Sequence, residues 1–290
     1  MPRAEPRAVT PLLLEGWPLP EPAEGAGKHE RGTVLVVGGA VSTPGAALLA
    51  GTAALRVGAG RLKIATVEAT AVALAVAVPE AMVVGLPAGA GGSLDPASAD
   101  DVCAQAERAS AVLVGPGLLG TDDTAELLRR LLPALPDAPV VLDAVALGAL
   151  AVAPEAADGL RGRLVLTPNA GEAAQLLDGE QLHGRDAALA IAQRYGAAVA
   201  CHGGVADADG RVWSDESGGV GLGTSGSGDV LAGAVAGLLA RGADPAQAAV
   251  FGQYLHGAAG DRLAARTGKL GFLARELLEE LPAVLDRLSS

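Results

Sequence analysis

The sequence predicts an α/β fold in which helices cover both faces of a mostly parallel sheet. Two observations support this prediction. Short and almost continuously apolar runs are typical of strands that are buried on both faces. These runs alternate with longer stretches of helical character, as in parallel strands joined by helices. The apolar runs lie at residues 33–37, 61–67, 111–114, 140–143 and 164–166.

Helical patterns lie between these runs and fill the last third of the chain. The expected helices cover residues 44–57, 122–135, 171–177, 185–195, 229–240, 245–265 and 274–288.

We expect one folded domain, because no linker and no internal repeat divides the chain. The first residues are rich in proline and glutamate, so we interpret 1–28 as a loose N-terminal arm and 29–290 as the single domain. The glycine-, alanine- and proline-rich stretch 85–98 is expected to be an exposed loop.

Composition narrows the classes of function. Half of the 290 residues are hydrophobic, which is ample for a large core. The net charge of −12 argues against general nucleic-acid binding and against an anionic membrane surface. The longest Ala/Val-rich stretch, 71–78, is too short to span a bilayer. The two cysteines lack metal spacing and suit a reducing compartment, so we expect a cytoplasmic protein with no nucleic-acid or membrane partner.

The most informative motif is a glycine-rich turn, Gly226-Ser227-Gly228-Asp229, which opens directly into an apolar helix. Glycines let backbone N–H groups converge, and a helix start adds unpaired donors and a positive dipole end. We therefore expect the turn to bind an anion such as a phosphate. A side chain at Gly228 should be excluded by the phosphate or by a positive φ. Asp229 is the candidate base for a hydroxyl proton, and the alternative is an ordinary helix N-cap.

Other glycine-rich or polar turns follow the predicted strands, where ligands bind in parallel sheets. One of them, Gly115-x-Gly117-x-x-Gly120, fits the dinucleotide fingerprint by letter, but it follows several earlier strand–helix units, which disfavours a Rossmann dehydrogenase. Six such turns at successive strand ends are better explained by a ligand that runs along this edge. The turns lie at residues 38–46, 115–120, 143–147, 167–172, 202–204 and 226–229.

The pair Asn169 and Glu172 lies at the start of a predicted helix. An amide and a carboxylate at this spacing can orient waters around a Mg²⁺ ion on a nucleotide phosphate. The alternative is a capping pair, in which Asn169 caps the helix and Glu172 occupies its first turn. The glycine-rich turn at 226–229 favours the functional interpretation.

Together these motifs resemble the ribokinase-like superfamily, which combines Asn-x-x-Glu with Gly-x-Gly-Asp. Within it the chain looks most like the ADP/ATP-dependent NAD(P)H-hydrate dehydratases, over about residues 9–282. The resemblance implies a ribokinase-like three-layer α/β/α sandwich with a mostly parallel central sheet. The matching segments are 31–39, 44–47, 53–60, 78–80, 115–117, 167–172, 226–233 and 255–261.

The resemblance also implies an activity. This family repairs NADH or NADPH that has gained water on its nicotinamide ring. A nucleoside phosphate donates a phosphoryl group to the ring hydroxyl, and loss of phosphate restores the double bond. ADP or ATP and Mg²⁺ are the implied cofactors, and a homo-oligomer is the implied assembly. We expect no fused epimerase domain of the kind that this family often carries, and therefore a separate epimerase partner.

Site residues follow from the same resemblance. Asp229 matches the aspartate near the reacting hydroxyl, and the amides of 226–228 match an anion hole. The nucleotide is expected over His202, Gly203 and Gly204. The implied substrate contacts are Gly45, Ala46, Gly115, Gly117, Asn169 and Asp229.

Three departures from the family pattern bear on substrate and nucleotide. The family usually has His-Pro-Gly-Glu at 169–172, Lys-Gly at 202–203 and Asp-Ala-Asp at 143–145, where this chain has Asn-Ala-Gly-Glu, His-Gly and Asp-Ala-Val. The first departure resembles a true kinase, and the second removes a cation near the expected nucleotide. Two alternatives therefore stay open: a small-molecule kinase acting on a hydroxyalkyl heterocycle or a sugar, and a non-catalytic nucleotide-binding protein.

Overall fold

The computed structural model describes residues 5–21, 25 and 27–288. Within these residues the strands form one ten-stranded sheet in the order β1-β10-β9-β8-β7-β6-β5-β2-β3-β4. Neighbours are parallel except β8 with β9 and β9 with β10, which confirms the mostly parallel sheet. The strands are β1 (Arg7–Ala8), β2 (Thr33–Val37), β3 (Arg61–Val67), β4 (Ala81–Leu86), β5 (Ala111–Val114), β6 (Val140–Leu142), β7 (Leu164–Leu166), β8 (Ala198–Cys201), β9 (Gly204–Ala206) and β10 (Val212–Ser214).

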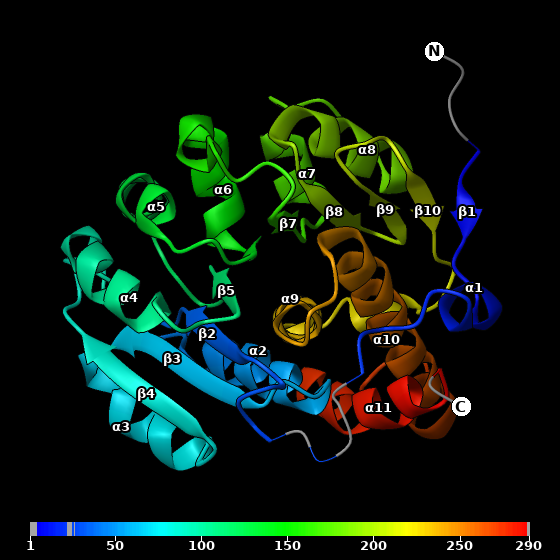
Figure 1. Ribbon diagram of the computed structural model, residues 1–290, viewed down its shortest axis with the longest axis horizontal. Coiled ribbons are helices and arrows are strands. Elements are labelled where there is room, and N and C mark those ends of the chain that lie inside the picture. Colours follow the sequence, from blue (N-terminus) through cyan, green and yellow to red (C-terminus); the bar gives the residue numbers. More distant parts are fainter. Residues whose placement is uncertain (1–4, 22–24, 26, 289–290) are drawn as a thin grey trace.

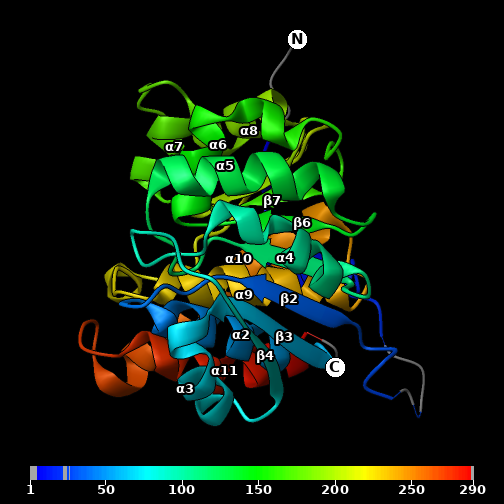
Figure 2. The ribbon, with the colours of Figure 1, turned by 90° about the vertical axis from the view of Figure 1, so that its left-hand side faces the viewer.

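Helices cover both faces of the sheet, so the three-layer prediction is confirmed (Figures 1 and 2). One layer consists of α4 (Ala99–Ala106), α5 (Thr121–Leu131), α6 (Val145–Val152), α7 (Ala170–Leu176) and α8 (Gly184–Tyr195). The other consists of α2 (Pro44–Arg56), α3 (Glu68–Ala77), α9 (Ser227–Ala240), α10 (Pro245–Thr267) and α11 (Ala274–Asp286). The short helix α1 (Pro11–Glu15) lies beside β1, and 3₁₀ turns occur at Pro96–Ser98, Leu132–Ala134, Pro154–Ala157 and Val220–Leu222.

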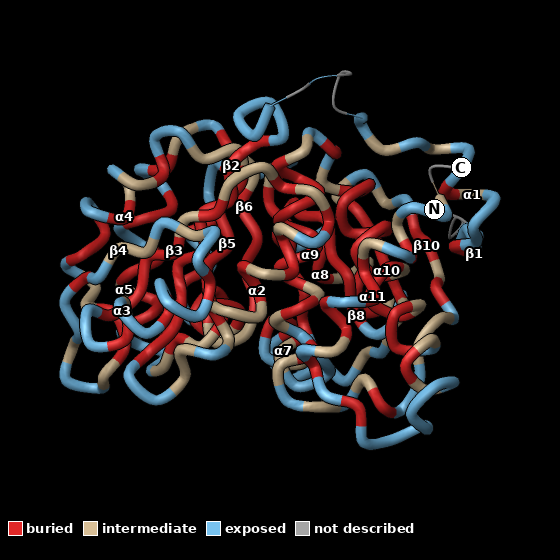
Figure 3. Tube along the Cα trace, turned by 90° about the horizontal axis from the view of Figure 1, so that it is seen from below, coloured by how far each residue is buried: buried red, intermediate tan, exposed pale blue. Residues whose placement is uncertain are grey.

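The apolar strands divide their side chains between two cores. Along β2, Val34 and Val36 pack toward the α9 layer, whereas Leu35 and Val37 pack toward the α5 layer. Both faces are therefore buried, which is why the strand sequence is continuously apolar. Figure 3 shows the buried interior of the sheet beneath exposed outer loops. Small residues bring neighbouring helices of one layer close together, because a Cβ at Gly233 of α9 would lie only 2.1 Å from the Ala50 carbonyl oxygen of α2.

The N-terminal segment is anchored, so the expectation of a loose arm is wrong for its described residues. Strand β1 pairs in parallel with β10. Leu14 is completely buried, and the Trp17 ring stacks on Trp213 with centroids 5.8 Å apart. The buried area of these large side chains holds the segment in place. The division into an arm over 1–28 and a domain over 29–290 stays a prediction.

The stretch 85–98 is not the exposed loop that its composition suggested. Its first residues complete β4, and Ala88 forms an isolated bridge with Leu94. Leu94 is buried, and the Ser93 hydroxyl accepts a 3.0 Å hydrogen bond from the Leu119 N–H. The segment therefore packs beside the turn that follows β5.

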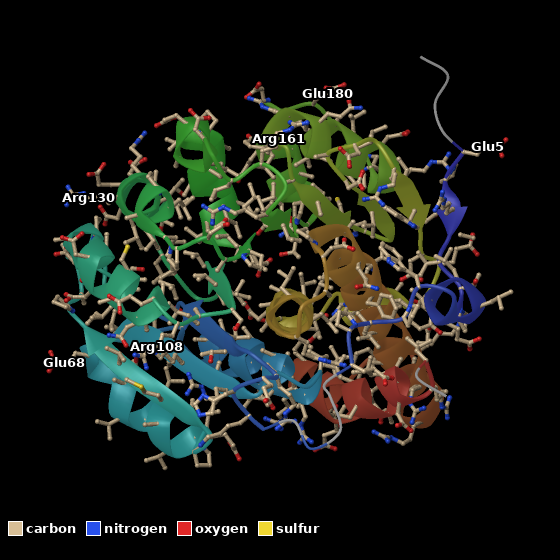
Figure 4. All side chains as sticks on the ribbon, viewed as in Figure 1. Glu5, Glu68, Arg108, Arg130, Arg161 and Glu180 are labelled. Atoms are coloured by element: carbon tan, nitrogen blue, oxygen red, sulfur yellow. The ribbon has the colours of Figure 1, made fainter. Side chains whose placement is uncertain are left out.

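Charged side chains lie mostly at the periphery. Figure 4 shows Glu68, Arg130 and Glu180 at the outline of the molecule, and Arg108 and Arg161 are exposed as well. Among the residues with described structure, none of the helices combines the length and the hydropathy needed to cross a bilayer.

Candidate active site

The turns after β2 and β5 meet at the carboxyl ends of the strands. From β2 the chain adds β3 and β4 on one side and later β5 on the other, so the strand order reverses between β2 and β5. Ligands bind at such a switch point in parallel sheets. The Gly39 N–H donates to the Pro116 carbonyl at 2.8 Å, and the Thr43 hydroxyl donates to the Gly117 carbonyl at 2.7 Å.

These contacts bring the four turn residues predicted to bind substrate to one edge. Gly115 has φ +130°, and a Cβ there would lie 1.8 Å from the Asp143 carbonyl oxygen. Gly117 lies next to Thr43 and Ala46. Gly45 is exposed, and a Cβ added to it would have no atom within 4 Å. Glycine is required at 115 for packing of neighbouring turns, independently of any ligand. Contact of this edge with substrate stays a prediction.

Helix α9 begins at Ser227 with Gly226 as its N-cap. Gly226 has φ +88°, and a Cβ there would lie 2.6 Å from the Leu49 side chain. Gly228 instead lies in the first helical turn, exposed, with nothing within 4 Å of a Cβ. A positive φ at Gly228 is therefore excluded, and the left-handed position is Gly226. Open space above Gly228 still permits the close approach of an anion.

Some N–H and hydroxyl groups of this turn form hydrogen bonds within the protein, and others do not. The Ser227 N–H donates to the Thr224 carbonyl at 3.2 Å, and the Ser227 hydroxyl lies 2.8 Å from Nε2 of His256. Across the described chain, no backbone carbonyl accepts from the N–H groups of Gly228 and Asp229. These two amides at the start of a 14-residue helix are thus the donors best placed for an anion.

Asp229 is not a helix cap, which excludes the alternative interpretation of this residue. It is the third residue of α9, and no side chain caps that helix. Burial, which is the largest cause, and the charges of Asp143 and Glu172 together raise the pKa of Asp229 to about 7. A carboxylate that accepts protons near neutral pH is suited to general base catalysis.

Asp143 belongs to the same electrostatic cluster, and sequence reasoning did not select it as a site residue. It follows β6, is 4% exposed, and accepts a 2.7 Å hydrogen bond from the Thr167 hydroxyl. Burial raises its pKa to about 6. Burial also raises the pKa of Glu172 to about 7, with a smaller contribution from the Asp143 charge. An aspartate directly after a buried strand at this edge was the available signal.

Asn169 and Glu172 form a capping box at the start of α7. The Asn169 side chain accepts from the Glu172 N–H at 3.0 Å, and the Glu172 carboxylate accepts from the Asn169 N–H at 2.9 Å. The capping alternative is therefore correct as a description of their contacts. No three His, Cys, Asp or Glu side chains of the described residues are arranged to hold a metal ion. A water-mediated role of the pair at Mg²⁺ stays a prediction.

The turn between β8 and β9 carries the residues predicted to lie under the nucleotide. His202 has φ +45° and Gly203 has φ +77°. The Ala170 N–H donates to Nε2 of His202 at 2.9 Å, which places the proton of the neutral ring on Nδ1. A cavity of about 500 Å³ opens beside this turn, large enough for a nucleotide. Its lining is Ala170, Leu182, His183, Gly184, Arg185, Cys201, His202 and Ser214.

Arg185 is the cation that this cavity offers and that sequence reasoning missed. It lies in the first turn of α8, and a Cβ at Gly204 would meet its backbone N at 2.1 Å. Its guanidinium forms no ion pair with any residue of the described part of the chain. An arginine is well suited to pair with a phosphate.

The contrast between Gly226 and Gly228 yields a prediction. Gly228→Ala should fold as stably as the parent, because the position is helical and open, yet its methyl group should weaken ADP binding at least ~10-fold. Gly226→Ala should instead lower the free energy of unfolding by about 1–3 kcal/mol, since it forces a side chain into positive φ. Calorimetry with ADP and thermal unfolding measure the two effects. Unchanged ADP affinity in Gly228→Ala would place the phosphate elsewhere.

The fold places the chain in a known class. A ribokinase-like superfamily protein from Enterococcus faecalis superposes with a TM-score of 0.81 at 23% identity, covering 97% of this chain and 96% of that one. The ADP/ATP-dependent NAD(P)H-hydrate dehydratase from Bacillus subtilis, co-crystallized with ATP/Mg²⁺, superposes with a TM-score of 0.79 at 29% identity, covering 98% and 99%. The structure therefore has the ribokinase-like fold.

Sequence comparison identifies the family within that class. The family model for NAD(P)H-hydrate dehydratase matches residues 34–283. The chain belongs to this family. It is 44% identical over 292 residues to an ADP-dependent (S)-NAD(P)H-hydrate dehydratase of Xanthomonas campestris, covering 97% of both. It is 33% identical to the bifunctional NAD(P)H-hydrate repair enzyme of Escherichia coli and spans 48% of that longer chain.

Proposed function

We propose that this chain dehydrates hydrated NADH or NADPH, with ADP or ATP as the phosphoryl donor. The observation that carries the proposal is the start of α9, where free amides of Gly228 and Asp229 adjoin a carboxylate whose pKa is raised to about 7. Donors for a phosphoryl group and an acceptor for a proton therefore lie in one helical turn. Family membership over residues 34–283 supports the same chemistry.

In the first step, Asp229 accepts the proton of the ring hydroxyl while the hydroxyl oxygen bonds to the terminal phosphorus of the nucleotide. The bond from phosphorus to the bridging oxygen breaks, and its electron pair leaves with AMP when ADP is the donor, or with ADP when ATP is. The amides of Gly228 and Asp229 stabilise the charge on the phosphoryl oxygens during transfer.

In the second step, phosphate leaves the ring carbon with the electron pair of the carbon–oxygen bond. The neighbouring carbon loses a proton to solvent water, and the electron pair of that carbon–hydrogen bond restores the ring double bond. Asp229, protonated in the first step, returns its proton to the departing phosphate. The products are NADH or NADPH, inorganic phosphate and the shortened nucleotide.

A Mg²⁺ ion fits this site only as an ion held mainly by the nucleotide. Asn169 and Glu172 already bond to each other's backbone, so they offer few free oxygens. Mg²⁺ typically keeps several waters and uses one or two carboxylates plus phosphates. We assign Glu172 to hold it through water. When bound, the ion would neutralise phosphate charge.

We place the nucleotide over the turn 202–204 and in the adjoining cavity, with Arg185 as its positive charge. A bifunctional NAD(P)H-hydrate repair enzyme is among the longer relatives, and we propose an epimerase as a partner of this chain. We further propose a homo-oligomer that acts in the cytoplasm, where both thiols stay reduced.

The decisive experiment mixes the protein with hydrated NADH and either ADP, ATP or no nucleotide. Recovery of NADH absorbance that requires a nucleotide, with release of phosphate, is the expected result. A small-molecule kinase would instead leave the hydrate unchanged and phosphorylate another hydroxyl compound. A non-catalytic protein would bind the nucleotide without turnover.

Arg185 provides a sharper test of the nucleotide site. Arg185→Gln should raise the KM for ADP about 10-fold and leave kcat within about twofold, because a charged hydrogen bond contributes roughly 1.5–3 kcal/mol to binding. Arg108→Gln, an exposed arginine outside the site, is the matched control and should change neither constant. An unchanged KM in Arg185→Gln would remove the nucleotide phosphates from this cavity.

A further inference from the structure

A buried pair of side chains lies beneath the start of α9. The Ser227 hydroxyl lies 2.8 Å from Nε2 of His256, and the two residues are 3% and 7% exposed. Ser227 is the first residue of α9, whereas His256 lies in the middle of α10. The pair therefore ties the anion-binding end of one helix to the body of another.

Burial also fixes the charge state of His256. It lowers the pKa of His256 to about 4, and a hydrogen bond with the Ser227 backbone opposes this only in part. The ring is therefore neutral at physiological pH, and it adds no charge beneath the helix end. It acts on Ser227 through the 2.8 Å hydrogen bond between its Nε2 and the Ser227 hydroxyl.

The turn that Ser227 completes is held at few points. Gly226 has φ +88°, and the Ser227 N–H bonds to the Thr224 carbonyl. The next two amides, of Gly228 and Asp229, have no backbone acceptor among the described residues. The Gly228 amide belongs to the peptide unit that follows Ser227, and the Asp229 amide belongs to the unit after it, so the orientation of Ser227 sets the direction of both.

We propose that His256 is a positioning residue for phosphoryl transfer, holding Ser227 so that the amides of Gly228 and Asp229 point at the transferred group. Because His256 is buried and bonds to Ser227, we assign its effect to Ser227 and not to direct contact with nucleotide or substrate. This inference rests on the proposed function for its catalytic consequence. Its structural consequence, a fixed turn at Gly226, stands independently.

A double-mutant cycle tests the coupling. His256→Leu and Ser227→Ala should each lower kcat by ~10–100-fold, the scale expected when catalytic donors are misplaced by a fraction of an ångström to an ångström. The double variant should lose no more than either single one, because both changes remove the same hydrogen bond. Effects that multiply, or a kcat within about twofold of the parent in folded single variants, would overturn the proposal.

Two further variants separate positioning from general stability. His256→Gln keeps a polar group that can reach Ser227, so it should recover kcat to within about threefold of the parent. Tyr195→Phe removes another buried hydrogen bond, from the Tyr195 hydroxyl to the Leu176 carbonyl at 3.3 Å, far along the chain from α9. It should lower the melting temperature without changing kcat. Equal losses of kcat in His256→Leu and Tyr195→Phe would reduce His256 to a stability role.

Amide hydrogen exchange tests the proposal without any turnover. In His256→Leu, exchange of the Ser227 amide should accelerate at least ~10-fold, because its bond to Thr224 loses support, while amides in β5 and β6 stay protected. If His256→Leu shows fast Ser227 exchange but the parent has no dehydratase activity, the positioning role is kept and the proposed function is rejected. Unchanged Ser227 exchange would overturn the positioning role even in an active enzyme.

Discussion

Asp229→Asn should lower the kcat of the dehydratase by ~10²–10⁴, the usual contribution of a positioned acid–base group. Asparagine keeps the shape of aspartate but cannot accept the hydroxyl proton. ADP affinity should stay nearly unchanged, because the donors for phosphate are backbone amides. The measurement is single-turnover dehydration of hydrated NADH, with ADP affinity determined in parallel. A kcat within threefold of the parent would remove Asp229 from proton transfer.

The same variant should be more heat-stable than the parent at pH 8. Burial and the charges of Asp143 and Glu172 raise the pKa of Asp229 to about 7, above the ordinary value near 4. The folded state therefore binds this proton more tightly than the unfolded state, and stability falls as pH rises from about 4 through 7. Asparagine removes this loss, so lower activity and a higher melting temperature should appear together.

Asp123→Asn is the matched control for both effects. Asp123 is the third residue of α5, as Asp229 is of α9, but it is exposed. Its replacement should leave kcat unchanged and should not raise the melting temperature at pH 8. A similar stabilisation in both variants would assign the effect to helix position rather than to burial of a charge.

The strands that were predicted best from the sequence are those whose side chains are buried on both faces of the sheet. Strands β2, β3, β5, β6 and β7 match their predicted ranges closely, and the expected helices are present within a few residues. Strands β4 and β8 to β10 were not predicted. Strand β4 lies at the sheet edge with exposed residues, and β9 and β10 have only three residues each. The segments of β9 and β10 are too short to form the apolar run that marks a central strand, whereas β4 and β8 are apolar in sequence and were missed although they carry that signal.

In the site, residues that are adjacent in sequence were predicted, whereas residues that only the fold brings together were missed. The glycine-rich turn was recognisable because its residues are adjacent in sequence, although the positive φ belongs to Gly226 rather than Gly228. Asp143 and Arg185 escaped prediction for a different reason. Each joins its site only through the order of strands, which brings the ends of β6 and β8 next to α7 and α8. For Asp143 the position directly after a predicted strand was a local signal, whereas no residue next to Arg185 in the sequence marks its approach to the turn after β8.

The carboxylate cluster predicts an unusual pH dependence of the reaction. Asp229 must be ionised to accept a proton, and its raised pKa of about 7 means that kcat/KM should fall as pH drops below about 7. Below that point the loss is tenfold per pH unit, so activity at pH 5 should be ~100-fold lower than the plateau. An ordinary exposed aspartate would retain full activity there.

Asp143→Asn tests the origin of this acid limb. Its charge raises the pKa of Asp229, although burial is the larger cause, so its removal should shift the limb toward lower pH without returning it to about 4. The limb belongs to the cluster as a whole, because the carboxylates of Asp143, Glu172 and Asp229 titrate together. The pH profile of kcat/KM for the parent and Asp143→Asn is the measurement, with Asp123→Asn as control. An acid limb near pH 4 in the parent would show that the active base is not a buried carboxylate, and an unshifted limb in Asp143→Asn would show that these charges do not interact.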